Sequence, residues 1–496
     1  MNTFTKKIAL CISFIALMQI NMSAQNEIDA LRFSETDWQG TARFMGAGKA
    51  FGAVGAEFSA LNTNPASIGL YKRSDVTFTP MTISAFRNTS NYNGYGALAQ
   101  EVKYNVGSAG IVLAMNGISS TLWKKFQVGY GFNRIKNYNN VLSIDGRNQG
   151  ATIGSVIADV ATNLGMDNWP ERGPGVETWV AWESYLIDPK PGTTDAYIAT
   201  LKGVDMRQRV SVTQTGGNDE MVFSFGSNYD DKLFLGATLG VPFINFSERR
   251  IYQEINDLKE NAAYWEFQNL TITDRHTVRT TGINLKLGII YQLFDFLRVG
   301  AAFHTPTYYG NVRDFFERQM LARAIDNAGS FTVGEKDGYI NRFNYSLTTP
   351  LRAMGNVVFL IQQRAFISAE YEFADYGTAN MYSPIYNFAG ENQNVRDLYG
   401  FSHIARVGAE FSVTQIFSIR AGYNYISSPY KYEINDASRH YASAGFGFRT
   451  RFFYSDFAYA FTISKEKLWM FDPQFVNAAH NQFITHRIML TLGARF

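Results

Sequence analysis

Apolar and polar residues alternate with a period of two along most of the chain, from Ser74 to the last residue. In the stretch 415–427, Phe417, Ile419, Ala421 and Tyr423 alternate with Ser418, Arg420, Gly422 and Asn424. Because successive side chains of a strand point to opposite faces, the pattern predicts strands with one apolar face and one small or polar face. Most of these runs are 11 to 20 residues long. Strands of soluble proteins have about 5–6 residues and transmembrane strands need about 9–11, so the pattern favours strands that cross a membrane.

The runs number about 14, and bacterial membrane barrels have even strand counts. They cover 74–88, 104–116, 121–137, 219–229, 232–250, 276–293, 296–310, 339–362, 363–377, 400–413, 415–427, 437–450, 452–464 and 482–496. The even-numbered runs end in tight turns, whereas the odd-numbered runs end in longer connections, the longest being 138–218. Short turns at one end and long loops at the other are typical of outer-membrane barrels. We therefore expect an all-β fold, a transmembrane antiparallel barrel of about 14 strands.

The first 24 residues have the features of a secretory signal peptide. Lys6 and Lys7 precede an apolar stretch from Ile8 to Ile20, and the small residues Ser23 and Ala24 offer a cleavage site. The apolar stretch is shorter than the roughly 20 residues of a spanning helix. Its removal would also remove Cys11, the only cysteine, so we expect no disulfide and no thiolate metal site in the mature chain. A cleaved leader and a barrel together predict the outer membrane of a Gram-negative bacterium.

Composition supports this class and excludes others. Aromatic residues make up 15% of the chain, with 40 Phe and 28 Tyr, and there are 42 Gly. The mean hydropathy of −0.16 is too polar for a bundle of transmembrane helices. The formal charge of +2 falls to zero without the leader, which leaves no basic field for nucleic acid.

A segment of small residues, 25–72, precedes the first strand and does not alternate. A barrel of about 14 strands encloses a lumen that side chains alone do not fill, so this segment is expected to fold inward. Its stretch GAGKAFGAVGAEFSALNTNPASIGLY, residues 46–71, resembles the N-terminal hatch of the FadL/TodX family of outer-membrane channels for hydrophobic compounds. The triplet Asn64-Pro65-Ala66 is the mark of that hatch. The chain therefore divides into a signal peptide (1–24), a hatch segment (25–72) and a barrel (73–496).

The resemblance implies a function and several site residues. Members of the family take up long-chain fatty acids or aromatic hydrocarbons by diffusion, and the ligand leaves sideways into the membrane through a kink in the third strand. By this resemblance, Asn64, Pro65 and Ala66 form the hatch contact, and Gly129 and Gly131 are candidate kink positions. The alternative explanation for these two glycines is the relief of crowding in the lumen, which the residues alone favour. Pro242, Pro306 and Pro350 cannot donate ladder hydrogen bonds and predict bulges or gaps.

Other residues are candidates for contacts with a ligand. Parity places Arg406, Arg420 and His304 in the lumen, where an arginine can bind a carboxylate head group. The alternative is that these arginines pair with lumen acids. Within the loop 138–218, residues 151–164 have an apolar face at helical spacing and predict a helix, either in a capture groove or in a loop subdomain packed on itself. Residues 315–325 are a second helix candidate.

The sequence gives little support for an enzymatic function. Gly46-Ala47-Gly48-Lys49 lacks the spacing of a phosphate-binding loop, and the six histidines are scattered. We expect no catalytic residues, no cofactor and no metal. The expected partners are a hydrophobic small molecule and outer-membrane lipid, with a monomeric chain. Two alternatives stay open at this stage: a binding or assembly barrel without transport, serving secretion or surface attachment, and a hemin receptor.

Overall fold

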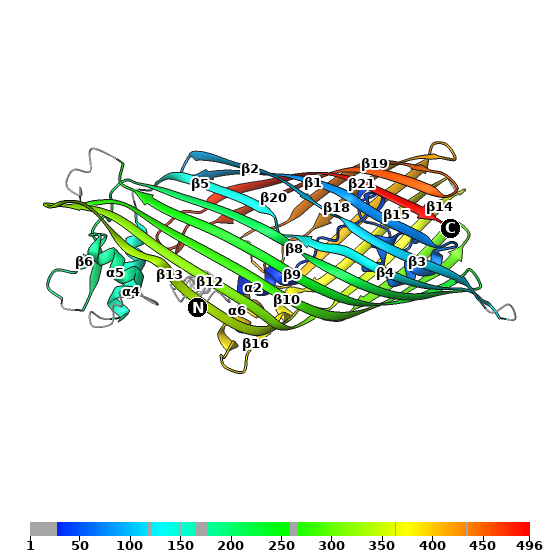
Figure 1. Ribbon diagram of the computed structural model, residues 1–496, viewed down its shortest axis with the longest axis horizontal. Coiled ribbons are helices and arrows are strands. Elements are labelled where there is room, and N and C mark those ends of the chain that lie inside the picture. Colours follow the sequence, from blue (N-terminus) through cyan, green and yellow to red (C-terminus); the bar gives the residue numbers. More distant parts are fainter. Residues whose placement is uncertain are drawn as a thin grey trace, which may run out of the picture.

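The strands form one closed antiparallel barrel, whose first strand pairs with its last (Figure 1). The structure, a computed structural model, describes residues 27–117, 121–148, 150–164, 176–193, 195–257, 266–362, 364–432 and 435–496. The predicted leader, 1–24, lies outside the described residues. With each interrupted strand taken as one, the barrel has 14 strands, which confirms the predicted fold class.

Four barrel strands are interrupted and continue under a second label. The strands are β1 (Asp75–Tyr92), β2 (Tyr95–Asn105) with β3 (Ser108–Asn116), β4 (Trp123–Asn137) with β5 (Asn140–Asn148), β8 (Met206–Tyr229), β9 (Leu233–Ile255), β10 (Phe267–Phe294), β11 (Leu297–His304) with β12 (Tyr308–Asp326), β14 (Arg352–Ile361) with β13 (Gly329–Thr348), β15 (Ala365–Asp375), β17 (Phe401–Ser412), β18 (Phe417–Ile426), β19 (Arg439–Arg449), β20 (Phe453–Leu468) and β21 (Ala479–Arg495). The short strand β16 (Asn380–Tyr382) pairs with β13.

The barrel is apolar outside and polar inside, the reverse of a soluble protein. Large apolar side chains such as Phe225, Ile367 and Leu492 are exposed on its outer face. Charged side chains such as Lys286 and Arg406 are buried in its interior. Because exposed apolar surface on this scale is stable only against lipid, the barrel crosses a membrane through its strands. Among the described residues, no helix is long and apolar enough to span a membrane.

The strands extend beyond the predicted runs at the end with the long connections. β1 and β2 continue to a two-residue turn at Asn93-Gly94, where a longer loop was expected. The predicted helix at 315–325 is wrong, because these residues lie in β12 and pair with β10 and β13. The stretch has apolar residues near helical spacing, but two neighbouring strands satisfy its backbone hydrogen bonds and so decide its conformation.

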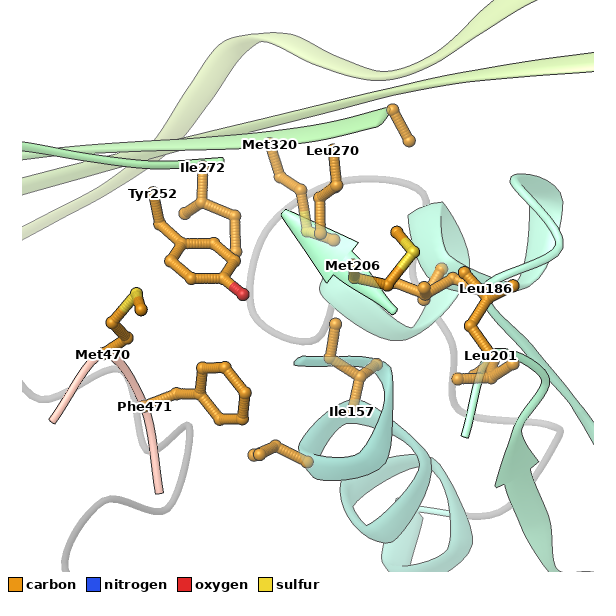
Figure 2. Packing of buried hydrophobic residues seen from close by; sticks show 14 of the residues in the cluster. Ile157, Leu186, Leu201, Met206, Tyr252, Leu270, Ile272, Met320, Met470 and Phe471 are labelled. Carbon is orange, nitrogen blue, oxygen red and sulfur yellow. The ribbon is translucent and has the colours of Figure 1, made fainter. Parts of the chain in front are cut away.

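The described residues between β5 and β8, within the predicted loop 138–218, form a small subdomain at that same end of the barrel (Figure 1). It contains α4 (Ile153–Leu164), α5 (Val176–Glu183), β6 (Ile187–Pro189) and β7 (Tyr197–Ala199), so the predicted helix at 151–164 is confirmed. Figure 2 shows how Ile157, Leu186 and Leu201 pack toward the barrel residues Met206 and Leu270. The subdomain thus rests on the extended strands through a shared apolar core.

The hatch segment, described from residue 27 to 72, lies inside the barrel (Figure 1). It contains α2 (Glu27–Ser34), α3 (Ala42–Gly46) and the 3-10 helices η2 (Phe58–Asn62) and η3 (Pro65–Leu70). Nearly all of its residues are buried. The connection between β15 and β17 contains η6 (Tyr376–Thr378) and α6 (Ala389–Leu398). Val395 and Leu398 of α6 share an apolar cluster with Phe33 of α2.

Candidate functional site

The Asn64-Pro65-Ala66 triplet joins the hatch segment to the barrel wall. Asn64 caps η3 by accepting a hydrogen bond from the backbone N–H of Ala66 at 3.0 Å, and Pro65 takes the first helical position. The Nδ2 atom of Asn64 donates to Oδ1 of Asn356 at 3.0 Å and to the carbonyl of Ile289 at 3.4 Å. One side chain therefore both starts the 3-10 helix and holds it against β10 and β14.

Glycines in the wall make room for this contact. A Cβ on Gly288 would lie 2.1 Å from Oδ1 of Asn64, and a Cβ on Gly236 would lie 2.2 Å from the carbonyl oxygen of Pro65. Both separations are shorter than any non-bonded contact allows, so the wall must be bare of side chains here. The role of these glycines was not predicted, because the sequence does not show which strands face the triplet.

The ladder is unbroken at Gly129 and Gly131, the candidate kink positions. In β4 these residues pair in register with β3 and β8, and the register shifts of β4 lie nearer its two ends. A Cβ on Gly129 would lie 3.0 Å from Ile68, and one on Gly131 would lie 2.5 Å from Phe58. The hatch segment thus packs closely on both glycines, as in the crowding alternative. Their part in a lateral opening stays a prediction.

The candidate arginines are already paired. Arg406 is 2% exposed and forms ion pairs with Glu370 and Glu372 of the neighbouring strand. Arg420 pairs with Glu410 and with Asp456. These are the lumen pairings that the sequence left open as the alternative to head-group binding. Their charges are balanced without a ligand.

Ion pairs also hold the hatch segment in the lumen. Arg43 of α3 pairs with Glu410 at 2.9 Å, which connects the segment to the network around Arg420. Lys49 pairs with Asp37 within the segment. Burial alone would raise the pKa of Asp37, but Lys49 and Arg487 outweigh burial and hold that pKa below its usual range. The carboxylate of Asp37 therefore stays ionised inside the barrel.

A small cavity of about 30 Å³ lies between the hatch segment and the barrel wall, which is room for about two water molecules. Its lining combines apolar and polar groups: Phe33, Trp38, Ile135, Tyr309 and Pro350 with Asn218, Glu220, Asn284, Lys286, His304 and Arg352. Lys286 pairs with Glu220 and lies 5.0 Å from the ring of Trp38. Lys286 lies at an inward position of β10, so the alternation of its strand could have identified it as a lumen residue.

His304, the third candidate, lines this cavity. Its Nε2 lies 3.0 Å from the carbonyl oxygen of Thr63, so Nε2 carries a proton and donates it to that bond. Among the described residues, Nδ1 of His304 has no hydrogen-bond partner, and neither does Oδ1 of Asn218 or of Asn284. Burying an acceptor without a donor costs free energy. The cavity therefore offers unused acceptors to a donor on a ligand or to water.

Two prolines interrupt the wall beside the cavity. Pro306 separates β11 from β12, and Pro350 separates β13 from β14. The register on both sides, His304 with Arg352 and Tyr308 with Thr348, sets the two prolines opposite each other. Neither can donate to the ladder, so adjacent strands each lack one donor at the same height, although Thr349 and Thr307 still bond to each other beside the break. This confirms the predicted gaps at Pro306 and Pro350. Pro242 lies within β9 and pairs with Glu220 of β8, but the ladder between β9 and β10 skips it, which agrees with the predicted gap.

Only one group among the described residues has the composition of a metal site. It consists of Asp29, His276 and Asp314, whose ligand atoms lie within 4.8 Å of one another. Nε2 of His276 lies 3.1 Å from the Asp314 carboxylate, and Arg32 pairs with Asp29 at 2.8 Å. The three side chains therefore make a cluster that ties α2 to the wall.

Comparisons with known proteins identify the fold. No protein-family model and no curated protein matches the chain. A solved structure of a FadL homologue from Pseudomonas aeruginosa is similar over 93% of this chain and 99% of its own, with a TM-score of 0.53 and 14% identity. The toluene transporter TodX of P. putida gives a TM-score of 0.52 and 12% identity over the same shares of each chain. The chain therefore shares the fold of the FadL homologue and of TodX, which confirms the resemblance at the level of architecture.

Proposed function

We propose that this protein is an outer-membrane channel for the passive uptake of hydrophobic molecules. The observation that carries the proposal is the lipid-facing barrel with the hatch segment buried inside it. TodX, with the same fold, is a toluene transporter, which supports a ligand of that kind. The aromatic side chains that line part of the cavity favour such a ligand.

The unused acceptors narrow the ligand class. Trp38, Phe33 and Tyr309 provide the apolar part of the cavity, and His304 and Asn284 provide acceptors without donors. A matching ligand is apolar with one hydrogen-bond donor, such as a phenol, an alcohol or a protonated carboxylic acid. Arg406 and Arg420 are not assigned to the head group, because their ion pairs are complete.

Passage sideways into the membrane fits best at the paired prolines. The wall next to the cavity is irregular where Pro306 and Pro350 face each other, since neither proline donates a ladder bond and the two strands are joined there through Thr307 and Thr349. We assign the lateral exit to this break rather than to the third strand.

The main test is uptake in reconstituted vesicles. Purified protein in liposomes is expected to admit labelled toluene, p-cresol and a long-chain fatty acid faster than protein-free liposomes do. If each of the three ligands enters liposomes with protein no faster than protein-free liposomes, the channel function is refuted. Stoichiometric co-purification of another protein in place of uptake would favour the assembly alternative. A Soret band on titration with hemin, lost in H304A, would favour the hemin receptor.

His304→Phe is expected to weaken the binding of p-cresol about five- to tenfold and to leave toluene unchanged, because the lost hydrogen bond contributes about 1 kcal/mol. The two ligands differ by one hydroxyl group, so any general damage to the cavity affects both and cancels in the ratio. Competition for uptake of labelled toluene measures both affinities. An unchanged ratio would remove His304 from the ligand site.

A disulfide across the proline break is expected to block lateral exit. Opposed residues of neighbouring strands have the Cα separation that a disulfide needs, so P306C/P350C should crosslink on oxidation and slow uptake at least tenfold, reversibly with reductant. L113C/V128C tests the third strand in the same way, and A421C/A444C, on an unbroken part of the wall, is the control. Slowing by L113C/V128C alone would return the exit to the third strand.

A further inference from the structure

Three tyrosine–histidine pairs stand on the outer face of the barrel. The Tyr hydroxyl and Nδ1 of His are 2.5 Å apart in Tyr371–His403, 2.6 Å apart in Tyr423–His440 and 2.7 Å apart in Tyr459–His486. All six residues are exposed. Each pair joins the two strands of one long-connection hairpin: β15 with β17, β18 with β19, and β20 with β21.

The pairs lie at one height on the wall. Each Tyr is six residues after the first residue of its strand, and each His is nine residues before the last residue of its own. A strand rises about 3.3 Å per residue and tilts about 40° in a barrel, so nine residues climb roughly 23 Å. The apolar band of such barrels is about 25 Å tall. The histidines therefore stand where the acyl chains end and the head groups begin.

Above one of these pairs the outer face carries only positive charge. Lys465 and Lys467 of β20 point outward with Tyr459, and Arg87 of β1 pairs in register with Ile484, two residues above His486. All three cations are exposed. Among the described residues none of the three forms a salt bridge, and the outward positions of β20, β21, β1 and β2 carry no acidic side chain. These cations stand roughly 28–35 Å above the strand ends by the same geometry.

The tyrosine–histidine arrangement is not repeated on β9 and β10. In β9 and β10, the positions that correspond to Tyr459 and His486 are Leu239 and Leu285, and both are exposed. Apolar side chains at this height can contact any acyl chain. Tyrosine–histidine pairs below cations without salt bridges can instead bind an anion at the level of the head groups.

We propose that β20, β21 and β1 form a binding surface for the phosphorylated head group of an outer-leaflet lipid. Arg87, Lys465 and Lys467 face the phosphates, which they bind with charge-assisted hydrogen bonds. Where Nδ1 of His486 accepts the Tyr459 hydroxyl, Nε2 carries the proton and donates to an oxygen at the boundary. Asp436, in the loop next to Lys467, forms no salt bridge with this patch. The proposal rests on the outer-membrane location proposed above, but not on transport.

The test is lipid binding by the purified full chain in nanodiscs of phosphatidylcholine. Fluorescent bisphosphorylated lipid A is the probe, with its dephosphorylated form and inorganic phosphate as competitors. R87Q/K465Q/K467Q is expected to lose about 100-fold in affinity, since each cation contributes about 1 kcal/mol. K124Q/K232Q/R451Q removes the same charge from exposed positions at the tight-turn end and should bind as the native chain does.

Several results would overturn the proposal: equal affinity of both triple variants, equal competition by dephosphorylated lipid A, or equal competition by inorganic phosphate. The last result would mean that the patch reads a free anion instead of a lipid. Uptake of toluene into liposomes without lipid A should be the same for the native chain and for R87Q/K465Q/K467Q. Failure of the lipid surface and failure of the channel therefore give different results.

Discussion

Replacing Arg406 by leucine is expected to lower the free energy of unfolding by about 3–5 kcal/mol, the cost of leaving a buried charge without its partner. Arg406 stands between Glu370 and Glu372, and the side chains of both acids are fully buried. Glu372 keeps a second cation, Arg352, whose Nη2 atom also donates to the carbonyl of Ser34 in α2. Glu370 keeps only the backbone N–H of Gly52. The loss therefore falls mainly on Glu370.

The double variant R406L/E370Q should recover part of that stability, because it removes the charge that R406L leaves unpaired. R451L, at an exposed turn, controls for the loss of an arginine from the barrel. Unfolding by urea in lipid vesicles measures all four chains. If R406L unfolds at the same urea concentration as the native chain, the lumen network does not stabilise the barrel.

The sequence predicted the membrane-crossing part of the strands well and the rest poorly. The run 482–496 corresponds to β21, and 415–427 contains β18. In these stretches one face contacts lipid and the other faces the lumen, so apolar residues occupy the first face and small or polar residues the second. Beyond the membrane that contrast ends. β12 continues through Phe315 and Phe316, where neighbouring residues are both apolar, and its alternation can no longer be recognised.

The site was predictable only where it lies on strands. Parity placed Arg406, Arg420 and His304 inside, and the structure agrees. Which acids neutralise the arginines follows from strand register, and register depends on pairing that one strand alone does not specify. Trp38 and Phe33 reach the cavity from the hatch segment, which has no periodicity to read. The role of the facing glycines, Gly236 and Gly288, becomes clear only once the triplet is placed against them.

Placing leucine at Gly288 is expected to unseat the hatch segment and make the membrane leak. The new Cβ would stand 2.1 Å from Oδ1 of Asn64 and 2.8 Å from the backbone nitrogen of Ala66, the two atoms that cap η3. η3 must then move away and lose the bonds from Asn64 to Asn356 and Ile289. A lumen of 14 strands is too wide for the remaining side chains to close. Ions should pass where the native barrel blocks them.

Single-channel recording in planar bilayers measures this leak, with the native chain giving no steps and G288L giving frequent large ones. G355L is the matched control, because a Cβ on Gly355 meets nothing within 4 Å. N64A removes the same hydrogen bonds without adding bulk, so a smaller leak from N64A than from G288L separates lost bonding from steric displacement. A tight bilayer with folded G288L would mean that the hatch segment is held elsewhere, by Arg43 and Glu410, and that the triplet is not its main attachment.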